Sequence, residues 1–312
     1  MEKRCLYCYG LLDDFETDFH PKCSRKIFAS SNVPHLPYSE QELESLAKSV
    51  IEKQTGLTGV QPKLSLHITS QKNGPKRFTI VGLWGGYILK PSSASYPQLP
   101  EVEDLTMHLA AIAKIKVVPH SLIRMNSGNL AYITKRIDRT KTGKIHMEDM
   151  CQLTERLTED KYRGSYEQIA KAIKKYSKTP GLDLVNFYEQ VLFCFLTSNA
   201  DMHLKNFSLI YQPNIGPVLS QGYDMLNTTL VNPDDQEQMA LSLNGKKNRI
   251  RKNDFIQAFT SAGLDKKQQD FIFNKMIDAK PQWMEMIQKS FLSKDFKEQY
   301  TEILSDRLET IG

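Results

Sequence analysis

The sequence predicts an α+β protein with two lobes, a sheet-rich lobe followed by a helical one. Between about residues 55 and 138, short runs of alternating apolar residues are broken by turn residues, which is typical of antiparallel strands. After residue 148 the apolar residues recur instead at helical spacing over long segments. We therefore expect a Cys/His segment over 1–30, a first lobe over 31–138 and a second lobe over 139–312.

Each lobe can be divided into elements from local signals. The first lobe is expected to contain, in order, a helix from about residue 40 capped by Ser39, strands within 55–69, 71–80 and 85–91, an amphipathic helix over 101–115 and two strands within 120–138. The second lobe is expected to contain helices over 165–177, 181–200, 251–263, 266–280 and 296–311, with a β-like stretch broken by Gly and Pro over 207–226. Internal repeats are absent from the sequence.

The composition excludes several classes of protein. Of the 312 residues, 40% are hydrophobic and 25% are charged, as in ordinary globular proteins. The net charge of +5 is mild, so direct binding to nucleic acid is not expected. No apolar run approaches the ~20 residues of a membrane span, and the first residues lack a leader-like apolar stretch. We expect a cytoplasmic protein without a membrane partner.

The N-terminal cysteines have the spacing of metal ligands. The segment reads Cys5-x2-Cys8-x11-His20-x2-Cys23, which is two ligand pairs, each about one turn apart. This pattern predicts a structural zinc site, because four protein ligands leave no open position for catalysis. The alternative is a group of reduced cysteines in a knuckle that has lost its metal.

A polar cluster over 198–207 lies between strongly apolar segments. Asp201 and Asn206 are five positions apart, the spacing of the aspartate and asparagine in the protein-kinase catalytic loop. Asp224 follows eighteen residues after Asn206, beyond a hairpin-like stretch. In a phosphotransferase, the first aspartate accepts the proton of the attacking hydroxyl, and the asparagine and second aspartate hold magnesium ions. Lys205, between them, is placed to neutralise the transferred phosphoryl group.

Further kinase-like features precede this cluster in the expected order. Gly56 and Gly59 lie on a turn before a strand, where backbone N–H groups approach phosphates. Lys90 ends the strand-like run YILK, and Glu101 or Glu103 of the next helix could pair with it. Each feature alone is better explained as a strand end, a helix cap or a turn. Their order across a β-then-α boundary is what indicates a kinase.

At these residues the chain resembles the HipA family of toxin-antitoxin serine/threonine kinases. The matching stretches include GVQPKLSL, YILKP, LPEVEDLTMHLA, DMHLKNFSLI and YDMLNT, between about residues 55 and 250. The resemblance implies a two-lobed protein-kinase-like fold with ATP and Mg²⁺ as cofactors. It implies the following site residues: Asp201 as catalytic base with His203 and Lys205 in its loop; Asn206 and Asp224 as magnesium ligands; Lys90 with Glu103 at the phosphates; Gly56, Thr58, Gly59 and Val60 in the phosphate loop; and Lys135 and Ile137 at the adenine hinge.

The resemblance also carries expectations about regulation and partners. Family members often carry an autophosphorylated serine in the phosphate loop, where this chain has Thr58 as its nearest hydroxyl. The chain is most like the compact HipT-type toxin of three-gene systems, which implies an antitoxin-like small protein and a DNA-binding partner. The substrates implied are aminoacyl-tRNA synthetases. Two alternatives are a lipid or small-molecule kinase, and a nucleotide-binding regulatory module without transfer activity.

Overall fold

The structure, a computed structural model, describes residues 3–51, 63–70, 74–81, 84–140, 142–235 and 237–312. The chain forms two compact units. Unit 1 comprises Met1–Asp104, Val118–Arg136 and Lys289–Phe291, and unit 2 comprises Leu105–Val117, Ile137–Gln288 and Leu292–Gly312. The expected α+β class, with a sheet-rich first part and a helical second part, is confirmed.

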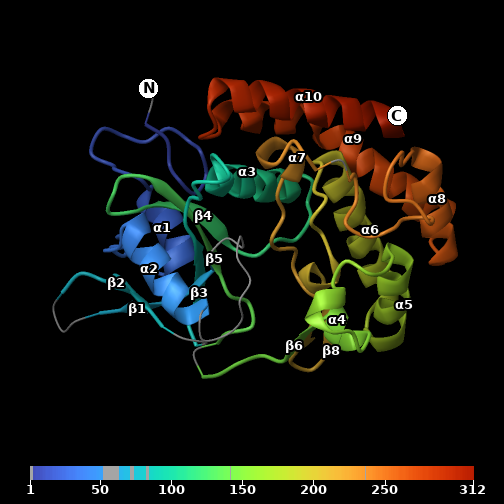
Figure 1. Cartoon of the computed structure of the whole chain (residues 1–312), viewed down its shortest axis with the longest axis horizontal. Helices are drawn as coiled ribbons and strands as arrows, with labels where there is room; N and C mark the ends of the chain where they lie inside the picture. Colours follow the sequence, from blue (N-terminus) through green and yellow to red (C-terminus); the bar gives the residue numbers. More distant parts are fainter. Residues whose placement is uncertain (1–2, 52–62, 71–73, 82–83, 141, 236) are drawn as a thin grey trace. The chain divides into compact units, whose positions relative to one another are not determined.

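Unit 1 is built on a five-stranded antiparallel sheet with strand order β2-β1-β3-β5-β4 (Figure 1). The strands are β1 (Leu64–Thr69), β2 (Arg77–Ile80), β3 (Tyr87–Lys90), β4 (His120–Arg124) and β5 (Leu130–Lys135). The register places Leu66 opposite Tyr87 and Leu89 opposite Ile133. Since side chains alternate across a strand, this pairing sets Leu89 and Lys90 on opposite faces of the sheet.

One face of this sheet packs against helices α1 (Pro21–Phe28) and α2 (Glu40–Ile51) (Figure 1). Phe28 lies fully buried among the apolar side chains of the sheet, with its ring 5.7 Å from that of Phe78. The α2 helix begins as predicted, because Ser39 and Glu42 form a reciprocal capping box. Burying a side chain such as Phe28 contributes about 1.5–3 kcal/mol.

Unit 2 combines a small antiparallel sheet, of strand order β6-β7-β8, with several helices. Its elements are β6 (Met147–Asp149), α4 (Met150–Leu153), the 3-10 turn η1 (Thr158–Asp160), α5 (Tyr166–Tyr176), α6 (Pro180–Leu196), η2 (Leu204–Asn206), β7 (Ser208–Gln212), β8 (Gly216–Leu219), α7 (Thr228–Val231), α8 (Lys252–Ser261), α9 (Lys266–Lys289) and α10 (Lys294–Ile311). Helix α3 (Leu99–Ile112) begins in unit 1, and its residues from Leu105 onward belong to unit 2.

The core of unit 2 forms around α6, whose second half is buried on every side. The ring of Phe193 lies 5.9 Å from that of Trp283 on α9, and the Trp283 Nε1–H donates to the backbone oxygen of Leu109 at 2.8 Å.

Among the residues that the structure describes, no helix has both the length and the apolar character that a membrane crossing requires.

The structure differs from the predicted elements in three places. Helix α9 continues past Pro281 to Lys289, because burial of Trp283 and Ile287 offsets the roughly 3 kcal/mol cost of an internal proline. Helix α6 ends at Leu196 rather than Ala200, since Ser198 has a left-handed φ of 50°. Helix α1, strand β6 and helix α4 are too short to show a periodic pattern.

Candidate active site

The lysine expected to bind phosphate lies in a buried ion pair within unit 1. Lys90 contacts Glu103 of α3, and the two residues are 5% and 2% exposed. The Lys90 Nζ also lies 5.4 Å from the centre of the Tyr132 ring, which is opposite it in the sheet. Of the two candidate glutamates, the structure pairs Glu103 with the lysine. A buried pair of this kind is held in one geometry, because either charge alone would be costly to bury.

The same face of the sheet carries a second buried polar group. The His120 ring stacks on Tyr132 with centroids 6.0 Å apart, and its Nδ1 lies 2.7 Å from Asp104 Oδ1. Asp104 follows Glu103 in α3, and its other carboxylate oxygen accepts a hydrogen bond from the Tyr9 hydroxyl at 2.8 Å. Tyr9, Asp104, His120, Tyr132, Lys90 and Glu103 therefore form a continuous buried network inside unit 1.

The loop expected to carry out catalysis is anchored at its start in unit 2. The Thr228 hydroxyl donates to the backbone oxygen of Ser198 and accepts from the N–H of Ala200, both at 2.9 Å. The Arg307 Nε–H donates to the Ser198 hydroxyl at 3.1 Å. These contacts fix the backbone immediately before Asp201, so the loop begins from a rigid position.

Asp201 and Asn206 are joined within this loop. The Asn206 side-chain amide donates to the backbone oxygen of Asp201 at 3.0 Å. This bond turns the amide nitrogen inward, so the amide oxygen is the atom presented for another ligand. The Asp201 side chain is exposed, and it accepts a hydrogen bond from the Tyr162 hydroxyl. Burial, followed by the hydrogen bond to Asp201, raises the pKa of Tyr162, so this hydroxyl stays a donor at neutral pH.

His203 supports the loop from inside. Its ring is 5% exposed and lies edge-on to the Tyr162 ring, with centroids 5.0 Å apart. Burial lowers the pKa of His203, which favours the neutral imidazole at neutral pH. Its Nδ1 is buried and has no hydrogen-bond partner among the residues that the structure describes.

Lys205 of the loop and the segment that carries Asp224 are held by groups that the sequence did not reveal. The Lys205 Nζ lies 2.8 Å from Asp149 Oδ2, while Asp149 Oδ1 caps helix α4. The Tyr223 hydroxyl donates to the Lys205 backbone oxygen at 3.1 Å. This bond ties the segment that carries Asp224 to the loop. Asp224 itself is half-buried and has a left-handed φ of 61°.

For several predicted site residues, the structure gives no contact that bears on their predicted role. Gly56, Thr58, Gly59 and Val60 lie outside the described residues. Lys135 is exposed at the end of β5 in unit 1, and Ile137 is half-buried at the start of the next stretch of unit 2. Their backbone groups stay predicted contacts for adenine.

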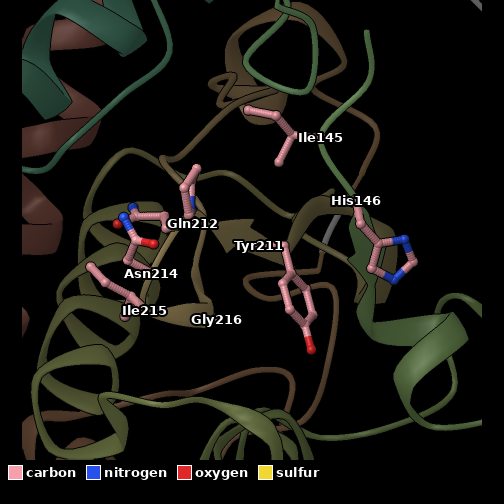
Figure 2. Close-up of a pocket in the computed structure, with 8 residues that line it drawn as sticks. Ile145, His146, Tyr211, Gln212, Asn214, Ile215 and Gly216 are labelled. Carbon is pink, nitrogen blue, oxygen red and sulfur yellow. The ribbon is translucent and has the colours of Figure 1, made fainter.

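A shallow hollow of about 500 Å³ lies in unit 2 beside the β7–β8 turn (Figure 2). It is lined by Ile145, His146 and the turn residues from Tyr211 to Gly216. Figure 2 shows the Tyr211 and His146 rings near one another, and their centroids are 5.7 Å apart. The lining contains no carboxylate, so this hollow lacks the groups that phosphoryl transfer requires.

The four N-terminal metal-ligand candidates lie together in unit 1. The ligand atoms of Cys5, Cys8, His20 and Cys23 are all within 4.8 Å of one another. The segment that carries them belongs to the hydrophobic core of the unit, with Cys5 and Cys23 buried.

Sequence reasoning did not identify Tyr162, Asp149, Tyr223 or Asp104 as supporting residues. Their contacts join positions between 15 and 95 residues apart, such as Tyr162 with Asp201 and Tyr9 with Asp104. No spacing rule connects residues over these separations. The one local signal was Asp149 three residues before Gln152, which forms the capping box of α4.

The buried Lys90–Glu103 network lies on a sheet-rich unit, and the loop with Asp201 and Asn206 lies on a helical unit. Together these features define a kinase-like mixed α/β protein. A family model described as the HipA-like C-terminal domain matches residues 55–284. A Haemophilus influenzae protein named "Putative kinase" is 30% identical over 275 residues, which cover 78% of this chain and 76% of that protein. A Sinorhizobium fredii protein, "Putative kinase Y4dM", is 31% identical over 68% of this chain and 54% of that protein. The chain therefore belongs to the HipA-like family.

Solved structures agree with this fold. The HipA toxin of Shewanella oneidensis, solved with HipB and its operator DNA, matches 89% of this chain and 74% of its own with a TM-score of 0.67 and 21% identity. The proinflammatory kinase CtkA of Helicobacter pylori matches 78% of this chain and 93% of its own with a TM-score of 0.55 and 16% identity. The kinase-like fold and the family resemblance expected from the sequence are confirmed.

Proposed function

We propose that this protein is a serine/threonine protein kinase that uses ATP and Mg²⁺ and acts as the toxin of a toxin-antitoxin system. The observation that carries the proposal is the loop geometry, in which Asn206 fixes the Asp201 backbone while the Asp201 carboxylate stays exposed. Family membership and relatives named as kinases add support.

Within the proposal, each residue has a defined task. The substrate serine or threonine hydroxyl oxygen attacks the γ-phosphorus, Asp201 takes the hydroxyl proton, and ADP leaves. Lys90, held by Glu103, binds the phosphates as a point charge. Lys205 lies in the same loop, where it pairs with Asp149, and it would offset the charge of the transferred group by exchanging that carboxylate for phosphoryl oxygens.

The residues proposed to hold magnesium have the right donor chemistry. The Asn206 Oδ1 accepts no hydrogen bond from any described residue. The side-chain nitrogen of Asn206, by contrast, contacts Asp201 and Met202. Together with the Asp224 carboxylate it offers hard oxygen ligands, which magnesium prefers. Magnesium bound there would supply charge neutralisation of the ATP phosphates.

The substrate and partners are proposed from family relationships. The HipA structure from Shewanella oneidensis contains HipB and operator DNA. We propose for this chain an antitoxin-like small protein that acts with a DNA-binding partner, without direct contact between this chain and DNA. We propose as substrate a translation component with an exposed serine or threonine, such as an aminoacyl-tRNA synthetase.

Magnesium-dependent nucleotide binding tests the proposed site directly. Titration of a fluorescent ATP analogue should show tight binding by the wild type only when Mg²⁺ is present. Asn206→Ala and Asp224→Asn should bind the analogue weakly, and Mg²⁺ should not strengthen that binding. Asn214→Ala, at the exposed β7–β8 turn, is the matched control and should bind normally. Nucleotide binding that neither magnesium nor the two substitutions affect would contradict the assignment.

Asp201→Ala separates the kinase from the alternatives. Loss of phosphoryl transfer with folding and ATP binding retained supports the kinase. Tight binding without transfer by the wild type would indicate a regulatory module. Transfer to phosphoinositides or small metabolites, with none to protein, would indicate the lipid or small-molecule kinase.

A further inference from the structure

Two distances within the N-terminal cluster match those of a tetrahedral zinc site. The Nδ1 of His20 lies 3.4 Å from Cys8 Sγ and 3.6 Å from Cys23 Sγ. A tetrahedral zinc ion with Zn–S of about 2.3 Å and Zn–N of about 2.0–2.1 Å separates such ligand atoms by about 3.6 Å. The two distances from His20 therefore match the spacing that the metal requires, and all four ligand atoms lie within 4.8 Å of one another.

The orientation of the His20 ring adds an independent observation. Its Nε2 lies 2.8 Å from the backbone oxygen of Leu11, so Nε2 carries the proton and donates it there. The Nδ1 that faces the sulfurs is then the unprotonated nitrogen, as a metal ligand must be. Three thiolates and one imidazole form a donor set that favours zinc over hard cations.

The turn that supplies two of the ligands also carries Tyr9. The backbone N–H of Tyr9 donates to the oxygen of Cys5, and the N–H of Cys5 donates to the oxygen of Gly10, both at 2.9 Å. Tyr9 has a left-handed φ of 60°, which is unfavourable for a residue with a large side chain. A metal that joins Cys5 and Cys8 would hold this turn closed and keep Tyr9 in its strained conformation.

Tyr9 connects this turn with the helix that carries Glu103. Its side chain is fully buried, its ring lies edge-on to Phe291 at 5.0 Å, and its hydroxyl donates to Asp104 Oδ2. Asp104 is adjacent to Glu103, the partner of Lys90. All of these residues belong to unit 1.

We propose that Cys5, Cys8, His20 and Cys23 bind one zinc ion, and that this zinc site positions the start of helix α3 through the Tyr9–Asp104 hydrogen bond. Tyr9 is thus a positioning residue for the Lys90–Glu103 pair. The second half of the proposal rests on the proposed function, since it assigns Lys90 to nucleotide binding.

Metal content tests the first half without any reference to activity. Elemental analysis of the dialysed full chain should find about one zinc per chain. Substitution with Co²⁺ should give the visible absorption of a tetrahedral thiolate site. Cys8→Ser removes a direct ligand and should lose most of the zinc, whereas Cys151→Ala, at a buried cysteine outside the cluster, should retain it. A folded wild-type protein without zinc or cobalt absorption would overturn the site.

A pair of tyrosines tests the second half. Tyr9→Phe keeps the ring and the ligands but removes the hydrogen bond to Asp104. The matched control is Tyr7→Phe, in the same turn, where the hydroxyl makes no hydrogen bond to any described residue. Both variants should keep zinc, and only Tyr9→Phe should speed amide exchange at residues 101–106 and weaken ATP-analogue binding by about tenfold.

The outcomes separate this inference from the proposed function. Unchanged amide exchange in Tyr9→Phe, with zinc bound, would overturn the positioning role. Faster exchange with zinc bound would support it, even if the wild type bound no nucleotide. The absence of nucleotide binding by the wild type would overturn the proposed function and leave the zinc site and its structural connection intact.

Discussion

The buried Lys90–Glu103 pair gives the strongest energetic prediction. Both side chains are almost fully buried, so Glu103→Gln would remove the carboxylate that contacts the buried Lys90 ammonium. Removing one partner of a buried pair costs about 3–5 kcal/mol. This is a large fraction of the roughly 5–15 kcal/mol by which a domain is stable, so we expect a marked loss of stability.

The double variant distinguishes a pair from two independent residues. Lys90→Met with Glu103→Gln removes both charges of the pair, so its cost should be smaller than the sum of the single costs, with a coupling energy of at least ~1.5 kcal/mol. Urea unfolding followed by circular dichroism would give the four free energies of unfolding. The exposed Lys266–Asp270 pair provides a control, where coupling of about 0.3–0.5 kcal/mol is expected.

Additive costs at the buried pair would refute this reasoning. If Lys90→Met and Glu103→Gln each cost less than ~1 kcal/mol and their effects summed, the two side chains would not form a desolvated pair. The double variant should also fail to bind ATP analogue tightly, whatever its stability, because the phosphate-binding charge is gone.

Three further variants test the loop and the core of unit 2. Tyr162→Phe should lower the phosphoryl-transfer rate about three- to tenfold without unfolding the chain, since Asp201 loses the donor that orients it; an unchanged rate would remove Tyr162 from the site. Thr228→Val, which deletes two buried hydrogen bonds at the loop start, should cost about 1–3 kcal/mol in thermal unfolding, and a neutral effect would contradict the anchoring role. Trp283→Ala should cost about 3–5 kcal/mol, because it empties a fully buried site and frees the Leu109 oxygen; a cost below 1 kcal/mol would argue against the continuation of α9 past Pro281.

The sequence was sufficient for the elements with strong periodicity. The strand that ends at Lys90 and the helix after Ser39 follow from a short β-rich run stopped by a proline and from a serine placed as a helix cap. The pairing of Lys90 with Glu103 could be predicted, because in kinases a lysine at the end of a strand pairs with a glutamate of the following helix.

Long-range contacts were beyond the reach of such patterns. The Tyr162–Asp201 and Tyr9–Asp104 hydrogen bonds depend on how separate segments pack, and single-sequence periodicity contains no such information. The continuation of α9 through Pro281 depends on tertiary burial that outweighs local propensity.

The central claim, that this chain transfers the γ-phosphoryl group of ATP, is tested most directly by one matched comparison. Wild type and Asp201→Asn would be incubated with Mg²⁺ and γ-labelled ATP, alone and with a bacterial cytosolic extract, and the labelled sites mapped by mass spectrometry. The account predicts label on serine or threonine of an extract protein with the wild type only. Equal labelling by both proteins, or none by the wild type while it binds ATP tightly, would contradict it.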